Sequence, residues 1–385
     1  MTLFLHTSDW QLGMVRHFLS DEAQARFTQA RIDVIRTIGQ LGVERKAEFV
    51  VVAGDVFESN LVNPQLVARS LQALREVPIR WYLLPGNHDP LDATSIYRQR
   101  VFQEQKPENV RVLEDSIPVE IVPGVDLVGA PWSTKRPLHD LVGAAVDELY
   151  PVPGRVRICV GHGAVDIGAP DTDNPSNIVF ETASRAISDG RIQYVALGDR
   201  HSSTIVGDAP RIRYSGAPEP TDYDEVRAGF VLLVNVTPND CTVEEVAVAK
   251  WRFLRHVFDL AGDQDVDVVK SFLDGIQSKE TTIVKLAFKG ALSLAGRSRL
   301  FALLKNQGNL FAAIESWERE SDLVLRPNQG DLDSLDLTGY AKDALDEIVG
   351  RIQLGTPDRE VAEDALALLY RLSQSKRPNL IGDRP

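Results

Sequence analysis

The first hundred residues alternate between short, fully apolar runs and longer segments with helical periodicity. Apolar strands are predicted at residues 3–7, 49–53 and 79–84. A helix is predicted over residues 20–45, with apolar positions near helical spacing and Ser20 as its N-cap, and a second helix follows Pro64. Continuous apolar strands between helices are typical of a sheet that is buried on both faces.

The pattern changes near residue 110 to short strands separated by Pro and Gly turns. Further strands are predicted at residues 156–160, 193–197, 211–215, 229–236 and 243–248, with a helix at 181–189. The last three of these strands follow one another without helices between them. This order favours an α/β fold over residues 1–250, in which two sheets form a sandwich with flanking helices.

The remainder of the chain has a different pattern. Strands at 251–260, 281–288 and 310–318 alternate with helices at 265–276 and 297–304, which predicts a small α+β domain over residues 251–328. After a polar stretch at 328–336, two helical patterns follow at 340–352 and 358–372. The second has an apolar face formed by Val361, Ala365, Leu368, Leu369 and Leu372. We predict that residues 329–385 form C-terminal helices that dock on a partner or on this chain, with a disordered tail from Ser375.

Five segments place metal-capable side chains directly after an apolar strand. They are SDWQLG, AGDVFES, PGNHDP, VGHG and LGDRH, and their candidate ligands and catalytic groups are Asp9, Gln11, Asp55, Asn87, His88, Asp89, His162, Asp199 and His201. The ends of strands are where ligands bind in open sheets. Glycines beside the polar groups let the backbone turn tightly and approach a ligand closely. The five segments therefore predict a single site.

The mixed set of carboxylate, amide and imidazole groups indicates metal chemistry on a phosphodiester. Two divalent ions about 3.5–4 Å apart can acidify a water, neutralise the phosphate and bind both the attacking and the leaving oxygen. Oxygen and nitrogen ligands together suit manganese, iron or zinc better than magnesium alone. We therefore predict two divalent metal ions, with Mn²⁺ preferred and Fe, Zn or Mg as the alternatives.

These segments resemble the signature of metallophosphoesterases of the calcineurin type. The start FLHTSDWQLG, the GDVFES segment and the later YSGAPEPTDYDE resemble in particular the SbcD family of DNA-repair nucleases. The likeness covers residues 1–240 and extends more loosely to the α+β domain, which resembles the capping domain of that family. It implies a metallophosphoesterase sandwich, a metal-dependent DNA nuclease activity, and an SbcC-like coiled-coil ATPase partner that binds the C-terminal helices.

The resemblance also implies a role for each candidate residue. The first metal would be held by Asp9, Gln11, Asp55 and His201. The second metal would be held by the bridging Asp55 with Asn87, His162 and Asp199. His88 matches the catalytic histidine, which orients the phosphate or protonates the leaving oxygen, and Asp89 would hold that imidazole in place. Arg200 lies between two presumed ligands and is a candidate for substrate contact.

Two positions depart from the family pattern. Gln11 stands where the first segment normally has a histidine, and Asp199 replaces the first histidine of Gly-His-x-His. Both replacements offer oxygen donors, but a neutral amide is a poor ligand, so the first metal is expected to be the weaker one. Two alternatives stay open: a catalytically weakened or inactive scaffold that binds an ATPase partner, and a phosphodiesterase for nucleotides or small esters.

Composition limits the class of protein. The net charge of −13 argues against a broad basic surface for nucleic acid, although it does not exclude DNA as a substrate. No apolar run approaches the about 18 residues of a membrane span. Cys159 and Cys241 are the two cysteines. Together with a strand that begins at residue 3, they predict a cytoplasmic protein without disulfides or a secretory leader. A homodimer, the choice of exo or endo action and the polarity of cleavage stay open.

Overall fold

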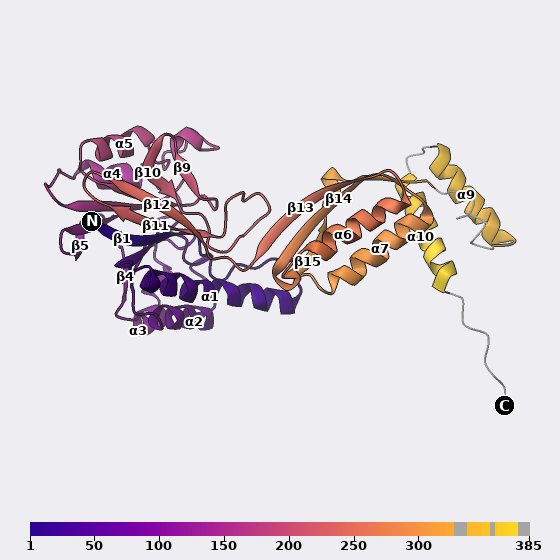
Figure 1. The fold of residues 1–385 in the computed structure, drawn as a ribbon, viewed down its shortest axis with the longest axis horizontal. Coiled ribbons are helices and arrows are strands. Elements are labelled where there is room, and N and C mark those ends of the chain that lie inside the picture. The colour runs from indigo at the N-terminus through magenta and orange to yellow at the C-terminus, as the bar shows by residue number, and fades with distance from the viewer. Residues whose placement is uncertain (327–336, 355–358, 376–385) are drawn as a thin grey trace, which may run out of the picture. The chain divides into compact units, whose positions relative to one another are not determined.

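A computed structural model of the chain describes residues 1–326, 337–354 and 359–375 (Figure 1). The chain divides into two units with separate internal contacts, Met1–Phe253 and Leu254–Pro385. The predicted polar stretch at 328–336 and the predicted tail beyond Ser375 lie outside the described residues. The two units are described one after the other.

The first sheet of unit 1 has six strands in the order β12-β11-β1-β2-β3-β4. Its parallel part consists of β1 (Thr2–Thr7), β2 (Phe49–Val52), β3 (Arg80–Leu83) and β4 (Val110–Val112). Two antiparallel strands extend it, β11 (Phe230–Val236) beside β1 and β12 (Cys241–Ala247) beside β11. Because β1, β2 and β3 are parallel, the loops that follow them leave the same edge of the sheet.

The second sheet also has six strands, in the order β5-β6-β7-β8-β10-β9. Its parallel part consists of β6 (Val125–Gly129), β7 (Val156–His162), β8 (Tyr194–Gly198) and β10 (Ala209–Tyr214). The antiparallel edge strands are β5 (Val119–Val122) and β9 (Thr204–Val206). The carboxyl ends of β7 and β8 therefore also share one edge.

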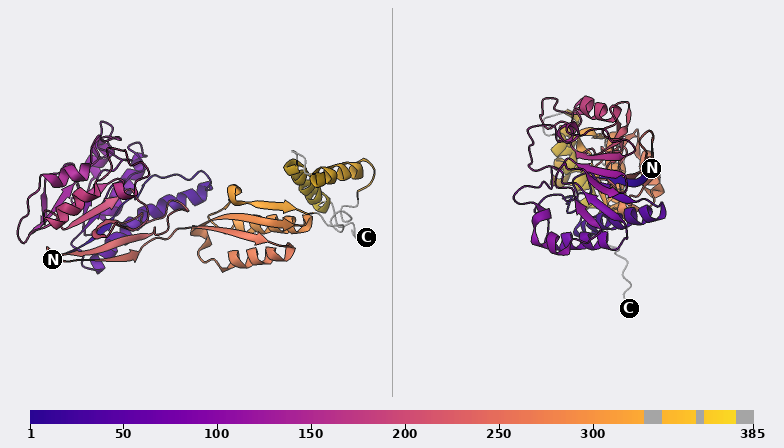
Figure 2. Two further views of the ribbon diagram at one scale, coloured as in Figure 1. Left: turned by 90° about the horizontal axis from the view of Figure 1, so that it is seen from above. Right: turned by 90° about the vertical axis from the view of Figure 1, so that its left-hand side faces the viewer.

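Helices cover the outer face of each sheet, as Figures 1 and 2 show. On the first sheet they are α1 (Asp21–Glu44), α2 (Pro64–Arg75) and α3 (Arg100–Gln105), and on the second α4 (Leu141–Asp147) and α5 (Phe180–Ser188). Two short 3₁₀ helices lie at Ile96–Arg98 and Asp166–Gly168. The predicted α/β sandwich of two sheets with flanking helices is confirmed.

The strand β2 explains why the sequence shows continuous apolar runs. Phe49 and Val51 belong to the core between the two sheets, together with Ile158 of β7. Val50 and Val52 belong to the core between the first sheet and its helices. Successive side chains of a strand point to opposite faces, so a strand with a core on each side is apolar at every position.

Capping residues and apolar periodicity in the sequence predicted the long helices more accurately than the short elements. The Ser20 side chain accepts a hydrogen bond from the Ala23 backbone N–H at 3.2 Å, which confirms it as the N-cap of α1. The sequence did not predict α3, α4, β9 or the later strand β16 (Asp322–Leu325). Each is between three and seven residues long. Such a short element shows too few turns or alternations for a periodic pattern.

Unit 2 contains a third sheet of four strands. Its members are β13 (Arg252–Leu260), β14 (Thr282–Leu292), β15 (Ala313–Ser316) and β16, with β15 and β16 both parallel to β14. Among its described residues, the helices are α6 (Val266–Gly275), α7 (Leu294–Gly308), α9 (Tyr340–Leu354) and α10 (Arg359–Ser375), and 3₁₀ helices lie at Asp263–Asp265, Lys279–Thr281 and Glu318–Glu320. The strands and helices predicted for this part of the chain are present, with shifted bounds.

The packing of α10 corrects one detail of the sequence analysis. Among the described side chains of this helix, Ala362 and Leu366 are the buried apolar residues, and they pack in a cluster with Leu294 and Leu325. Val361 and Leu368, which belong to the predicted apolar face, are 70% and 50% exposed. Leu369 of the predicted face also packs against this cluster, so the helix docks within unit 2 through a face that overlaps the predicted one only in part.

Both cysteines are free thiols, Cys159 buried and Cys241 half-buried. Burial raises the pKa of the Cys159 thiol to about 12, so this side chain stays protonated and apolar in character. Among the described helices, none has both the length and the apolar character that are needed to cross a bilayer.

A buried arginine on α1 connects three segments of unit 1. The Arg31 guanidinium donates hydrogen bonds to the carbonyls of Trp10 at 3.2 Å, Glu219 at 3.3 Å and Pro220 at 2.9 Å. It also lies 4.4 Å from the centroid of the Phe27 ring. Burial lowers its pKa to about 10, so it remains charged at neutral pH. Arg31 therefore holds the loop after β1 and the 219–220 segment against the helix.

We expect Arg31→Met to lower the free energy of unfolding by about 2–4 kcal/mol, because it leaves buried carbonyl oxygens without donors. Urea denaturation followed by circular dichroism measures this change. The matched control is Arg26→Met on the same helix, where the side chain is 38% exposed and an effect within about 0.5 kcal/mol is expected. Equal losses in the two variants would contradict the role given to Arg31.

Candidate metal centre

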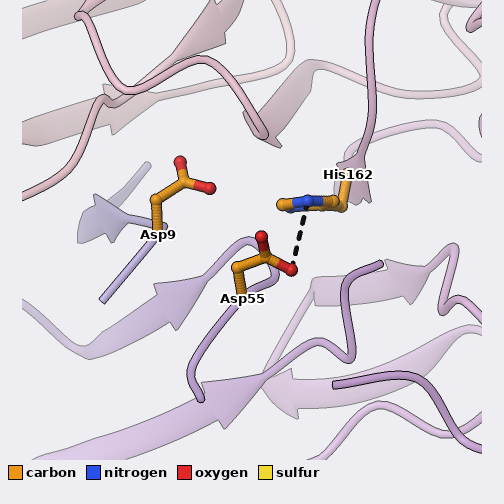
Figure 3. A group of neighbouring side chains, drawn as sticks. All are labelled: Asp9, Asp55 and His162. Atoms are coloured by element: carbon orange, nitrogen blue, oxygen red, sulfur yellow. Dashed lines mark ion pairs between the residues drawn. The ribbon is translucent and has the colours of Figure 1, made fainter. Parts of the chain in front are cut away.

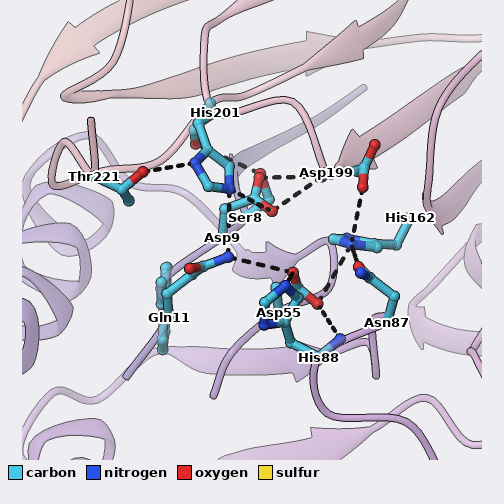
Figure 4. A network of polar contacts seen from close by, with 12 residues as sticks. Ser8, Asp9, Gln11, Asp55, Asn87, His88, His162, Asp199, His201 and Thr221 are labelled. Atoms are coloured by element: carbon cyan, nitrogen blue, oxygen red, sulfur yellow. Dashed lines mark hydrogen bonds and ion pairs between the residues drawn. The ribbon is translucent and has the colours of Figure 1, made fainter. Parts of the chain in front are cut away.

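The five predicted segments meet at one edge of the sandwich (Figure 4). Asp9 follows β1, Asp55 follows β2, His162 ends β7 and Asp199 follows β8. Backbone hydrogen bonds join the first two loops, from Asp9 N to Gly54 O at 3.1 Å and from Gln11 N to Asp55 O at 3.0 Å. The loops meet because the carboxyl ends of the parallel strands of both sheets lie at this edge.

The candidate ligands of the five segments are called the metal-capable group below. Three buried side chains form its centre (Figure 3). Asp9, Asp55 and His162 each offer one ligand atom, and these atoms all lie within 4.8 Å of one another. The three residues are at most 2% exposed. The His162 Nδ1 lies 2.9 Å from the Ala53 carbonyl, to which it donates, so its Nε2 faces the Asp55 carboxylate at 3.4 Å. Two carboxylates buried together need a compensating positive charge, and this donor set fits a divalent cation.

The pKa shifts at the centre follow from burial and mutual charge. Burial raises the pKa of Asp9. Burial also acts to raise the pKa of Asp55, but the charge and hydrogen bond of His162 outweigh it and hold this pKa below its usual value. Burial acts to lower the pKa of His162, yet the neighbouring carboxylates raise it well above its usual value. A metal ligand must be a neutral imidazole, so a cation displaces this proton and binds more weakly as the pH falls.

The residues predicted for the second metal lie together around His162. Its Nε2 is 2.7 Å from Asn87 Oδ1 and 3.9 Å from Asp199 Oδ1. The Asp199 backbone N–H donates to the Asp9 carboxylate, at 3.0 Å from Oδ1. The replacement of histidine by Asp199 therefore leaves a carboxylate oxygen near the same ring nitrogen of His162 that Asn87 contacts (Figure 4).

The residues predicted for the first metal are also adjacent, but their donor atoms fit less well. Gln11 turns its amide nitrogen toward the group, 3.4 Å from Asp55 Oδ2 and 3.3 Å from His201 Nε2. His201 Nε2 lies 4.0 Å from Asp9 Oδ1. The Gln11 amide has to rotate by a half-turn to offer its oxygen to a cation.

His201 is oriented by two residues that the sequence analysis missed. Its Nδ1 lies 2.8 Å from both Glu225 Oε1 and Thr221 Oγ1. Burial lowers the pKa of His201, but the hydrogen bond to Glu225 and the charge of Asp9 raise it to about 9. A carboxylate behind an imidazole is the usual way to fix the orientation of a histidine ligand. Both residues lie in the YSGAPEPTDYDE segment, so the signal was present in the sequence.

Other partners of the group were missed as well. The Ser8 hydroxyl donates to Asp9 Oδ2 at 2.6 Å and lies 2.7 Å from the Ser215 hydroxyl. The Trp132 indole N–H donates to the His162 carbonyl at 2.7 Å. Ser8 directly precedes a predicted ligand and Ser215 lies in the YSGAPEPTDYDE segment, whereas Trp132 comes from a loop that no motif marked.

The structure places His88 at the group and corrects the role predicted for Asp89. The His88 backbone N–H donates to Asp55 Oδ1 at 3.0 Å, and the ring Nε2 is 4.0 Å from Asp55 Oδ2. The His88 Nδ1 is 2.9 Å from the Glu58 carbonyl, so this carbonyl, and not Asp89, orients the imidazole.

Asp89 instead holds the two loops together. Its fully buried carboxylate accepts hydrogen bonds from the backbone N–H groups of Gly86 at 2.8 Å and Phe57 at 3.0 Å, and from the Tyr97 hydroxyl at 2.6 Å. Burial raises its pKa to about 6. Among the described residues, no hydrogen bond joins Asp89 to the His88 ring, whose Nδ1 faces the Glu58 carbonyl, so Asp89 acts on the position of the loop.

The backbone of the group is unusual. Four of the predicted ligand residues have a positive φ, namely Asp9 at 53°, Gln11 at 46°, Asp55 at 52° and Asp199 at 102°. Such conformations are uncommon for residues other than glycine and concentrate at functional sites. A Cβ at Gly54 would lie 2.1 Å from His162 Nδ1, and one at Gly86 would lie 2.2 Å from Asp55 Oδ1. These glycines are required by the close approach of the loops.

The predicted substrate contact, Arg200, lies beside the group, with its guanidinium 5.9 Å from the centroid of the Tyr214 ring. It is exposed and follows Asp199 directly. Its position is compatible with contact to a substrate at the metal-capable group.

Two nuclease and repair proteins are similar in sequence to this chain. The chain is 27% identical over 266 residues to SbcD of the SbcCD nuclease from Escherichia coli K12, and the match covers 60% of this chain. It is 21% identical over 327 residues to the DNA double-strand break repair protein Mre11 of Archaeoglobus fulgidus, and this match covers 76% of this chain. The chain spans 64% of the length of the first relative and 67% of the second.

Two solved structures are similar in fold to part of this chain. A crystal structure of the protein TT1561 from Thermus thermophilus covers 64% of this chain and 99% of its own, with a TM-score of 0.41 and 10% identity. A dimetal phosphatase from Danio rerio covers 63% of this chain and 98% of its own, with a TM-score of 0.40 and 11% identity.

The predicted resemblance to the SbcD family is confirmed as a distant homology. The family model described as calcineurin-like phosphoesterase matches residues 2–203, which include all five segments that form the metal-capable group. Because this match covers more than half of the 385 residues, the chain belongs to the calcineurin-like phosphoesterase family.

Proposed function

We propose that this protein is the nuclease subunit of a DNA-repair complex and hydrolyses phosphodiester bonds in DNA with two divalent metal ions. The observation that carries the proposal is the buried group of Asp9, Asp55 and His162, surrounded by the other predicted ligands. The family supports a metal-dependent phosphoesterase. DNA as the substrate rests on the similarity to the bacterial nuclease protein and the archaeal repair protein.

We assign the ligands as follows. The first metal is held by Asp9, Gln11, Asp55 and His201, and the second by Asp55, Asn87, His162 and Asp199. Two divalent ions at such a site supply an acidified water and neutralise the charge of the phosphate. The mixture of oxygen and imidazole donors favours Mn²⁺ over Mg²⁺, with iron and zinc as alternatives.

His88 acts on the substrate directly in this proposal. Its side chain is 39% exposed, so it is accessible to a bound phosphodiester. Donation from Nδ1 to the Glu58 carbonyl leaves Nε2 directed toward Asp55 and the site. In the imidazolium form of His88, Nε2 also carries a proton, which can bind the phosphate or pass to the leaving oxygen and leave a neutral ring. Asp89 and Tyr97 act indirectly, by holding the loop that carries His88.

We extend the proposal to location and partners. The α+β domain of unit 2 serves as a cap for DNA, and the C-terminal helices α9 and α10 bind a coiled-coil ATPase of the SbcC type. The bacterial relative is named as one component of the SbcCD nuclease, which supports an assembly of this kind. The free thiols agree with a cytoplasmic protein.

The test uses the full chain with linear and hairpin DNA and with bis(p-nitrophenyl) phosphate, in the presence of Mn²⁺. We expect hydrolysis of both substrates, its loss on chelation with EDTA, and its return when Mn²⁺ is added back. Hydrolysis of the ester but not of DNA, with or without an ATPase partner, would favour a small-ester phosphodiesterase. No hydrolysis with any of the four metals would favour a scaffold.

The Gln11 position gives a separate prediction. We expect Gln11→His to tighten the weaker metal about 10-fold and to raise the rate, because imidazole replaces an amide that now presents its nitrogen. Calorimetric titration with Mn²⁺ beside the phosphodiesterase assay measures both effects. The control is Gln72→His on the exposed face of α2, which should change neither. If Gln11→His leaves affinity and rate unchanged, residue 11 is not a ligand.

A further inference from the structure

Glu219, in the YSGAPEPTDYDE segment, is a buried carboxylate that belongs to neither predicted metal. Its side chain is almost completely buried, since the residue is 1% exposed. The two carboxylate oxygens accept hydrogen bonds from the backbone N–H groups of Lys250 and Trp251, each at 3.0 Å. A buried carboxylate is costly unless its oxygens are paired in this way. Glu219 therefore joins the segment to the backbone that directly precedes β13.

Helix α1 holds the same point of the segment from another side. The Arg31 guanidinium donates hydrogen bonds to the carbonyls of Glu219 at 3.3 Å and Pro220 at 2.9 Å. On the same helix, the Phe27 ring packs edge-on against the Trp251 ring, with 5.0 Å between the centroids. Glu219 is thus fixed through its main chain by α1, and through its side chain by a stretch of backbone that also packs on α1.

From Glu219 the segment continues directly to the two groups that orient His201. Thr221 Oγ1 and Glu225 Oε1 each lie 2.8 Å from His201 Nδ1. The Glu225 carboxylate also accepts from the Thr221 backbone N–H at 2.7 Å, so these two residues hold each other in place. The chain from Glu219 to Thr221 spans at most about 7 Å. A shift of Glu219 therefore moves the groups behind the His201 ring.

The proposed first metal depends strongly on the placement of His201, which is its one imidazole ligand. Gln11 turns its amide nitrogen toward the group, and a neutral amide is a weak ligand even when its oxygen faces the ion. The distance between a metal and its ligand atom tolerates a change of only about 0.2 Å, so the imidazole must be held from behind. Residues that orient a ligating imidazole typically contribute about 10–100-fold to metal affinity.

We propose that Glu219 is a positioning residue for the first metal. It anchors residues 219–225 to the backbone before β13, and through them it holds the His201 ring in its binding orientation. The inference rests on the proposed two-metal function and concerns one of the two ions. Coupling between two sites is reciprocal, so the first metal in turn stabilises the contacts of Glu219 with Lys250 and Trp251.

The experiment titrates Mn²⁺ into the full chain by calorimetry and compares the wild type with Glu219→Gln. Glutamine has nearly the same shape but one acceptor oxygen, so one of the two N–H groups loses its partner. We expect the weaker ion to lose affinity about 10-fold and the tighter ion to stay within a factor of about two. Circular dichroism checks that the variant is folded.

The matched control is Asp140→Asn. Asp140 lies at the start of α4, and its carboxylate also accepts from two backbone N–H groups, those of Gly143 at 2.8 Å and Val179 at 2.9 Å. This variant should keep both affinities. Unchanged affinities in Glu219→Gln overturn the proposal, and so does an equal loss at both ions, which is the result expected of a general loss of structure.

A double-mutant cycle tests whether Glu219 acts through the groups behind His201. Glu225→Gln alone should also weaken the weaker ion, because the carboxylate behind the ring is lost. Adding Glu219→Gln to this variant should cost clearly less than the about 10-fold that it costs in the wild type, since the two changes act on one imidazole. Fully additive losses overturn the proposed route.

If the wild type does not bind two Mn²⁺ ions, the two-metal function fails, and the metal-free chain tests the positioning role alone. In protein labelled with ¹⁵N-histidine, the proton on His201 Nδ1, bonded to Glu225, should give a slowly exchanging resonance that is absent from His201→Gln. Its loss in Glu219→Gln and persistence in Asp140→Asn support the proposal. A resonance that persists in Glu219→Gln, or is absent from the wild type, overturns it.

Discussion

We expect Asp55→Asn to reduce the hydrolysis of bis(p-nitrophenyl) phosphate and of DNA by about 10³-fold or more, the scale reached when a group that stabilises charge at an active site is removed. Asp55 lies at the centre of the group, with its Oδ1 3.4 Å from His162 Nε2 and 3.0 Å from the His88 N–H. Asparagine keeps the shape but removes the charge on which the proposed binding of two metals depends. Initial rates with Mn²⁺, and calorimetric titration of Mn²⁺, measure the loss of activity and of metal together.

The control for Asp55→Asn is Asp126→Asn. Asp126 is about as buried as Asp55, at 3% exposed, but lies near the start of β6, where it pairs with Arg155 and Arg157. This change is expected to lower stability and to leave the rate per folded molecule unchanged. Full activity in Asp55→Asn would end the interpretation of the group as a metal centre. A similar loss of rate in Asp126→Asn would show that any buried charge in unit 1 has the same effect.

We expect His88→Ala to slow turnover by about 10²–10⁴-fold while metal binding is retained, because a general acid or phosphate donor contributes on this scale. His88 contacts Asp55 through its backbone N–H, which alanine keeps, whereas the imidazole Nε2 is removed. The loss should appear in kcat more than in KM. Steady-state kinetics and Mn²⁺ stoichiometry, measured on the same preparation, separate the two effects.

The control for His88→Ala is His17→Ala, since His17 is an exposed histidine outside the group. It should change neither kinetics nor stoichiometry. If His88→Ala loses a metal ion as well as activity, His88 is a ligand and not only a catalytic group. If its rate is within a factor of about two of the wild type, another side chain must protonate the leaving oxygen.

Part of the candidate site could be predicted because it is encoded locally. Each predicted ligand directly follows an apolar strand, and parallel strands bring the ends of neighbouring strands to one edge. Asp9, Asp55 and His162 were therefore expected in one place, and they lie there. The hydrogen-bond donors to the Asp89 carboxylate were not predictable in this way. Its carboxylate binds Phe57 N, 32 residues away in the sequence, and the Tyr97 hydroxyl, and neither contact follows a fixed spacing.

The sequence by itself determined the order and type of the long elements, the N-cap of α1 and the residues that gather at the edge of the sandwich. These depend on periodicity, capping and strand ends, which act over a few residues. Only the tertiary structure decided that Glu225 orients His201, that α10 buries Leu366, and that β10 lies between β8 and β9. These features depend on contacts between distant segments, where the partner is selected by packing and hydrogen-bond geometry and leaves no periodic pattern in the chain.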